Sequence, residues 1–148
     1  MKQNNAPGKL KILSYKPVAI WVFICAFMVL VMAVIGAITR LTGSGLSMVE
    51  WRPVTGFLPP HSPDEWTRVF DLYKASPQFQ KINFDMDLEG FKQIFFWEWF
   101  HRLWGRLIGV VYALPFFLFL VLRRLPTQHM GQFIILLILG ASQGLMGW

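Results

Sequence analysis

Three long stretches of this chain lack charged side chains, and polar segments separate them. They cover residues 18–39, 107–122 and 130–148. Each approaches the roughly 20 residues that a helix needs to cross about 30 Å of hydrocarbon. The middle stretch is short, but it extends outward through Trp99 and Trp104, whose rings suit the headgroup level. The pattern predicts an all-α integral membrane protein with three transmembrane helices.

The predicted organisation is a single membrane domain. It comprises a cytoplasmic tail (1–17), a first span (18–39), an outer loop (40–94), a second span (95–122), a cytoplasmic loop (123–129) and a third span (130–148). Lysines crowd the short tail, and Arg123 and Arg124 lie in the short second loop. Basic residues in short loops tend to stay in the cytoplasm. We therefore expect a multi-pass protein with a cytoplasmic amino terminus.

The outer loop carries signals of its own structure. Ser62, Pro63 and Glu65 match a helix start, with a hydroxyl cap, proline at the first helical position and a glutamate three residues after the cap. Apolar residues follow at helical spacing and predict a short amphipathic helix at the interface, bounded by Pro77. A second start at Asp87 leads into the second span.

Composition excludes a soluble domain and argues against nucleic acid as a partner. The chain is 55% hydrophobic and only 15% charged, a balance that a lipid bilayer explains. Its net charge of +6 comes from scattered basic residues that flank apolar spans, so they indicate orientation in the membrane rather than nucleic-acid binding. The first span is too long for the core of a signal peptide. The single cysteine, Cys25, is predicted to be a small buried residue that forms no disulfide within the chain.

The ionisable residues of the second span are the strongest functional candidates. Glu98, His101 and Arg102 must enter or touch the membrane, where such groups are costly. His101 precedes Arg123 by a stretch of helix roughly 33 Å long, which places it near the outer edge of the hydrocarbon. Helical spacing puts six residues on one stripe: Glu98, His101, Gly105, Ile108, Gly109 and Tyr112.

Two interpretations of this stripe remain open from the residues alone. A neutral imidazole is a good iron ligand, and the glycines just inward of His101 leave the flat space that a porphyrin needs. Alternatively, His101 hydrogen-bonds a neighbouring helix and the glycines allow close helix packing. Arg102 can pair with Glu98 on the helix surface. Arg102 and Arg106 can contact haem propionates or simply anchor the helix at the interface.

Other polar and small residues carry weaker signals. A polar turn that starts at Arg40 either offers backbone donors to an anion or terminates the first helix. His61 and His129 stand apart from any acid and are predicted to be surface residues. A small-residue face on the third span indicates tight helix packing or room for a bulky ligand, and its members are Gly140, Gly144 and Gly147.

Three runs of sequence together match a known family. They are RLTGSGLSM at 40–48, followed by Trp51, Pro53, Thr55, Gly56, Pro59 and Pro60; EWFHRLWGR at 98–106; and GASQGLMGW at 140–148. The first resembles the first outer loop of the haem A synthase family, a cytochrome oxidase assembly family, in its proteobacterial and mitochondrial form. The second resembles that family's Glu-x-x-His-Arg motif, and the third resembles its third helix.

The resemblance implies a fold of eight helices in two pseudo-symmetric halves, of which this chain would supply the amino-terminal one. It implies that His101 is an axial ligand of haem iron and that Glu98 is the catalytic acid. We take Arg102, Gly105 and Arg40 as further candidate cofactor-binding residues. The implied reaction oxidises a peripheral methyl of haem O to a formyl group, giving haem A for cytochrome oxidase. Haem O would bind in this half and haem B in the other.

Two alternatives stand beside this enzyme: a haem-binding electron-transfer module of the membrane, and a non-catalytic membrane assembly segment. The resemblance also implies a location in the bacterial inner membrane. Membrane lipid, haem O synthase, cytochrome oxidase assembly factors and a second copy of the chain are candidate partners. The third span reaches Trp148 without a polar tail, so we expect a truncated chain that is inactive by itself.

Overall fold

A computed structural model describes residues 15–50 and 57–146, and within these ranges every regular element is a helix. The elements are α1 (Lys16–Leu41), α2 (Pro63–Lys74), α3 (Pro77–Lys81), α4 (Leu88–Val121), the 3-10 helix η1 (Thr127–His129) and α5 (Met130–Met146). In this part of the chain α1, α4 and the stretch Thr127–Met146 are long and apolar enough to cross a membrane. The prediction of an all-α membrane protein with three spanning helices is confirmed.

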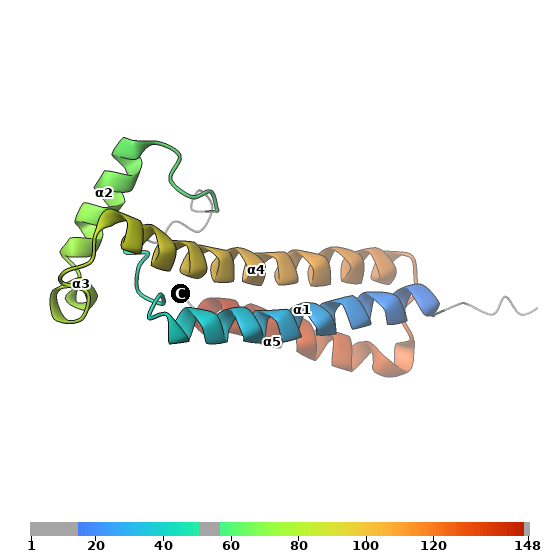
Figure 1. Ribbon diagram of the computed structural model, residues 1–148. Coiled ribbons are helices and arrows are strands. Elements are labelled where there is room, and N and C mark those ends of the chain that lie inside the picture. The colour runs from blue at the N-terminus through green and yellow to red at the C-terminus, as the bar shows by residue number, and fades with distance from the viewer. Residues whose placement is uncertain (1–14, 51–56, 147–148) are drawn as a thin grey trace, which may run out of the picture.

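The helices α1 and α4 run antiparallel, with α5 beside them and α2 and α3 at the end where α4 begins (Figure 1). Indole groups tie the long pair together. Trp21 Nε1 donates to the carbonyl of Val111 at 2.8 Å, and Trp104 Nε1 donates to the carbonyl of Met28 at 3.0 Å. Buried polar groups need such partners, so these bonds help to set the register between α1 and α4.

An inner core lies where α1 begins and α4 ends. The ring of Trp21 lies 5.1 Å from Tyr112, 5.6 Å from Phe119 and 5.8 Å from Phe133, measured between centroids. The Tyr112 hydroxyl donates to the carbonyl of Phe133 at 2.8 Å and thereby links α4 to α5. Cys25 belongs to the same cluster, which confirms its predicted burial.

An outer core joins α2 and α3 to the first turns of α4. Tyr73 and Phe91 are fully buried and stack with their ring centroids 5.0 Å apart. Phe70 and Phe95 complete the contact between α2 and α4. Aromatic side chains thus fasten α2 and α3 to the start of α4.

The two predicted helix starts are confirmed. The hydroxyl of Ser62 accepts from the amide of Glu65 at 3.2 Å, and Oδ1 of Asp87 accepts from the amide of Gly90 at 2.8 Å. Pro77 does not simply close the first of these helices, because α2 ends at Lys74 and Pro77 is the first residue of α3. From its cap, α4 runs unbroken out of the outer segment into the membrane span.

Candidate functional site

The candidate site lies where the loop after α1 folds back against α4. Gly43 has a φ of +63°, a left-handed conformation that glycine adopts without strain. The amide of Ser44 donates to the carbonyl of Thr39 at 2.9 Å, and the Thr39 hydroxyl lies 3.3 Å from the carbonyl of Trp97 on α4. Residues 42–48, which we call the clasp loop, are thereby held beside the turn of α4 that carries Glu98.

The carboxylate of Glu98 is the centre of this arrangement. Its Oε2 accepts from the amide of Ser47 at 2.6 Å, from the hydroxyl of Ser47 at 2.7 Å and from the amide of Met48 at 2.9 Å. Its Oε1 accepts from Nη2 of Arg102 at 2.5 Å. The residue is 3% exposed, so these four bonds stand in for water.

The predicted pair of Glu98 and Arg102 is confirmed, but its setting differs from the prediction. The side chain of Glu98 is only 4% exposed and that of Arg102 is 26% exposed. The alternative of a solvent-exposed surface pair is therefore wrong. The clasp loop covers the carboxylate, and covering of this kind cannot be inferred from the spacing of residues along one helix.

Ser47 was not identified as a site residue from the sequence, where it and its neighbour Ser44 appear only inside the first matching run. Both are buried, with exposed fractions of 2% and 0%. A serine in a glycine-containing turn is common on protein surfaces. The sequence did offer one signal. Two such serines follow the first membrane span directly, and the acid that the structure shows to be buried, Glu98, lies on the second span.

His101 packs against α1 rather than into open space. A Cβ placed on Gly36 would lie 3.2 Å from Nε2 of the imidazole, so the absence of a side chain at Gly36 makes room for the ring. No hydrogen bond of His101 is found among the described residues. The alternative in which His101 hydrogen-bonds a neighbouring helix is therefore wrong for the described residues, although the ring does lie in a helix interface.

The two glycines inward of His101 have different surroundings. A Cβ on Gly105 would lie 3.3 Å from the terminal methyl of Met32 on α1, so Gly105 allows close helix packing. A Cβ on Gly109 would meet no described atom within 4 Å. The predicted stripe therefore divides, since Glu98 faces the clasp loop, His101 and Gly105 face α1, and Gly109 faces open space.

Three arginines were candidates for an anionic group, and the structure distinguishes them. Arg102 is engaged by Glu98. Arg106 lies one helical turn further inward, and its Nη1 is a buried donor that has no hydrogen-bond partner among the described residues. Arg40 lies in the last turn of α1 rather than in the turn that follows, and its side chain is exposed. Among the described residues, no contact brings Arg40 and Arg102 together at one site.

An open groove of about 460 Å³ lies beside Glu98. Its walls are the clasp loop and the start of α3, and Glu98 and Arg102 are among its lining residues. Leu46 and Ile82 give it apolar sides, while Lys81 adds a positive charge. The groove therefore combines apolar surface with cationic groups, a combination that suits an amphipathic anion.

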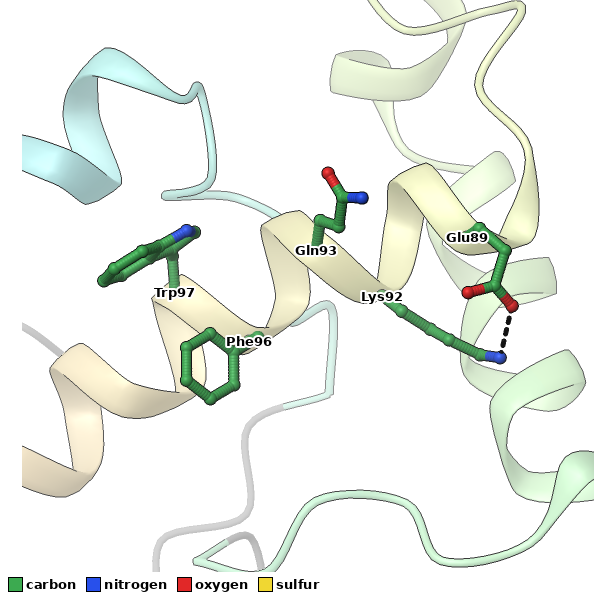
Figure 2. A pocket seen from close by; sticks show the side chains of 5 residues that line it. All are labelled: Glu89, Lys92, Gln93, Phe96 and Trp97. Atoms are coloured by element: carbon green, nitrogen blue, oxygen red, sulfur yellow. Dashed lines mark hydrogen bonds and ion pairs between the residues drawn. The ribbon is translucent and has the colours of Figure 1, made fainter.

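A second hollow lies on the outer turns of α4 (Figure 2). There Lys92 Nζ lies 2.6 Å from Oε1 of Glu89, and the acid of this pair is 73% exposed. An exposed pair of this kind binds weakly and does not define a site. Across residues 15–50 and 57–146, no group of three or more His, Cys, Asp or Glu side chains could hold a metal ion.

Several predicted features are not supported by contacts or cannot be assessed. A Cβ on Gly140 or on Gly144 would meet no described atom within 4 Å, so this face of α5 is unpacked within the described residues. Trp51, Pro53, Thr55, Gly56, Gly147 and Trp148 lie outside the described residues, as do the lysines at positions 2, 9 and 11.

Comparison with known proteins agrees with the motifs. A family model described as "Cytochrome oxidase assembly protein" matches residues 19–148. The chain is 54% identical to a Heme A synthase of Caulobacter vibrioides over 133 residues, 90% of this chain and 39% of that protein. It is 53% identical to a Heme A synthase of Rhodospirillum centenum over 133 residues, 90% of this chain and 36% of that protein. No solved structure matches the chain.

The matches cover less than half of each relative, as expected for a truncated amino-terminal half. A Heme A synthase of Paracoccus denitrificans is 48% identical over 88% of this chain, which is 34% of that protein. The chain therefore spans a little over a third of the length of the curated relatives it matches. Because the family model covers nearly all of the sequence, the chain belongs to the cytochrome oxidase assembly protein family.

Proposed function

We propose that this chain forms the haem O binding part of a haem A synthase, which oxidises a peripheral methyl of haem O to a formyl group. The observation that carries the proposal is the 54% identity to a Heme A synthase over 90% of this chain. The buried Glu98 one turn from His101 supports it, because an acid and an imidazole at the outer end of a span suit haem chemistry. Activity belongs, in this proposal, to the complete protein.

The described residues fit a haem by their chemistry. His101 would supply a nitrogen ligand to the iron, and no hydrogen bond among the described residues has to break for it to do so. The buried, unpartnered Nη1 of Arg106 is a donor that a haem propionate would satisfy. When bound, the haem supplies the iron and the methyl group to be oxidised. The reaction also requires an electron acceptor and a source of the formyl oxygen.

Glu98 could either exchange a proton or stabilise a positive charge during the reaction, and its contacts support the second role. Four donors already satisfy the carboxylate, so it can stabilise a developing positive charge nearby without any rearrangement. Arg102 gives the one hydrogen bond to Oε1 found among the described residues, and its side chain is partly exposed.

We further propose that the protein lies in the bacterial inner membrane with its amino terminus in the cytoplasm. Arg123 and Arg124, in the short connection between α4 and η1, support this orientation. It places the clasp loop, His101 and the groove on the outer side. Haem O synthase is a candidate donor of the substrate, and cytochrome oxidase assembly factors or a second copy are candidate partners.

Haem extraction tests the proposed function. The protein would be expressed from its complete gene in a host that makes haem O but has no haem A synthase of its own. Haem A, or its alcohol precursor, in the purified protein would support the enzyme. Haem B alone would support an electron-transfer module, and a protein without haem would support an assembly segment; either result would overturn the proposal.

A further inference from the structure

The clasp loop is attached to α4 mainly through one carboxylate. Within the described residues, Ser47 and Met48 together give three of the four hydrogen bonds to Glu98. All three go to the same oxygen, Oε2. The other oxygen, Oε1, contacts Arg102 alone. The two oxygens of the acid therefore have different tasks, with one holding the loop and the other lying beside the arginine of the groove.

Only one of the three loop donors belongs to a side chain. The hydroxyl of Ser47 lies 2.7 Å from Oε2 of Glu98 and 3.1 Å from the carbonyl of Ser44. A hydroxyl has a single proton to donate. Of the two oxygens, the carboxylate oxygen of Glu98 is closer than the carbonyl oxygen and is the stronger acceptor. The proton of Ser47 is therefore directed at Glu98. Ser47 is 2% exposed, so the protein shields this bond from bulk water.

The three hydrogen bonds to Oε2 fix the orientation of the Glu98 carboxylate. Three donors on Oε2 prevent rotation of the carboxylate group about its terminal bond, because rotation would break all of them. Oε1 and Arg102 then remain on the side of the groove, where both residues contribute to the lining. Loss of the hydroxyl leaves two backbone amides, which permit more movement of the carboxylate.

We propose that Ser47 is a positioning residue that holds Oε2 of Glu98, so that Oε1 and Arg102 are presented to the groove in a fixed orientation. This inference rests on the proposed haem chemistry of the site, because it concerns how Glu98 is aimed at a substrate. The competing explanation is that Ser47 only stabilises the loop. In that case any buried serine of the loop would serve equally well.

Ser44 provides the matched control. It lies in the same loop and is fully buried, and its hydroxyl contacts that of Thr42 at 2.5 Å rather than Glu98. Ser47→Ala and Ser44→Ala each remove one buried hydroxyl from the clasp loop. The variants would be made in the protein expressed from its complete gene, in the host that supplies haem O. Bound haem O, its absorption spectrum and the haem A formed would be measured for each.

We expect Ser47→Ala to retain haem O and an unchanged spectrum while conversion to haem A falls by about tenfold, the usual effect of losing a hydrogen bond to a charged group. Ser44→Ala should convert haem O normally. Ser47→Thr keeps a hydroxyl and should recover conversion in preparations whose haem spectrum is intact. Normal conversion in Ser47→Ala, or an equal loss in Ser44→Ala, would overturn the positioning role.

A second measurement keeps the inference testable if the proposed function fails. Should the unmodified protein bind no haem O or form no haem A, amide hydrogen exchange of the clasp loop would be compared between it and Glu98→Gln. Loss of the charge should speed exchange at the amides of Ser47 and Met48 by about tenfold, because both donate to Oε2. Unchanged exchange at both amides would contradict the inference directly.

Discussion

The position of His101 depends on Gly36 of α1, which has no side chain and so leaves room for the imidazole. The 3.2 Å separation between its Nε2 and a Cβ placed on Gly36 is tighter than ordinary contacts between such atoms. A methyl group there would force the imidazole to shift by a few tenths of an ångström. If His101 binds haem iron as proposed, its binding should respond to changes at Gly36.

Gly36→Ala should therefore alter the haem spectrum of the complete protein while α1 remains folded. The expected change is a shift in the main absorption band, or a fall in haem content, because a displaced imidazole would be a poorer ligand for haem iron. Gly109→Ala is the matched control, since its new methyl group would meet no described atom within 4 Å. If the two variants gave equal spectra, the absence of a side chain at Gly36 would not be needed for haem binding.

His101→Ala tests the ligand assignment itself. Removing the imidazole should abolish the spectral signature of one haem, while the helices remain folded because the ring makes no hydrogen bond with a described residue. Absorption spectra and pyridine-extracted haem would be compared at equal protein amounts. An unchanged haem content and spectrum would contradict the assignment of His101 as an axial ligand.

At the scale of elements, helix starts were predictable and the clasp loop was not. The caps at Ser62 and Asp87 depend on residues three positions apart, so the local sequence contains the whole signal. The bonds that close the clasp loop join positions about fifty residues apart, and two of the donors are backbone amides. Backbone amides are present at almost every residue, so side-chain patterns do not reveal which of them will meet Glu98.

The start of α2 also contains a group whose protonation the structure affects. The backbone amide of His61 donates to Oε2 of Glu65 at 2.8 Å, and this bond lowers the pKa of Glu65 from its ordinary value of 4.5. Because the pKa of Glu65 is lowered in the folded state, the hydrogen bond contributes its full stabilisation at pH values above the ordinary pKa. Its contribution disappears as the pH falls through the lowered pKa of the folded protein.

We expect the amide proton resonance of His61 to move as the pH is lowered through the pKa of Glu65, with a midpoint below 4.5. The cause is loss of the charged acceptor when Glu65 gains a proton. Nuclear magnetic resonance of the protein in lipid nanodiscs would follow this amide. Glu65→Gln should abolish the titration, and a midpoint above the ordinary pKa would contradict the hydrogen bond.

At the scale of the whole molecule, one residue connects all three spanning helices. Trp21 of α1 is 5% exposed, donates to Val111 of α4 and stacks on Phe133 of α5 with centroids 5.8 Å apart. Much of the remaining helix surface is apolar and exposed, as lipid contact requires. Since lipid is as apolar as these side chains, packing and hydrogen bonds rather than the hydrophobic effect must hold the helices together.

Trp21→Ala should lower the thermal stability of the protein in detergent more than any loss of lipid-facing surface. Removal of a buried Trp leaves a cavity between the three helices and costs about 3 kcal/mol. Trp21→Phe keeps most of the ring and loses the bond to Val111, at a cost of about 1 kcal/mol. Phe23→Ala on the same helix is the control, because Phe23 is 76% exposed and its loss should change stability little. Size-exclusion profiles after heating would rank the three variants. If Phe23→Ala proved as damaging as Trp21→Ala, the packing around Trp21 would not be what joins α1, α4 and α5.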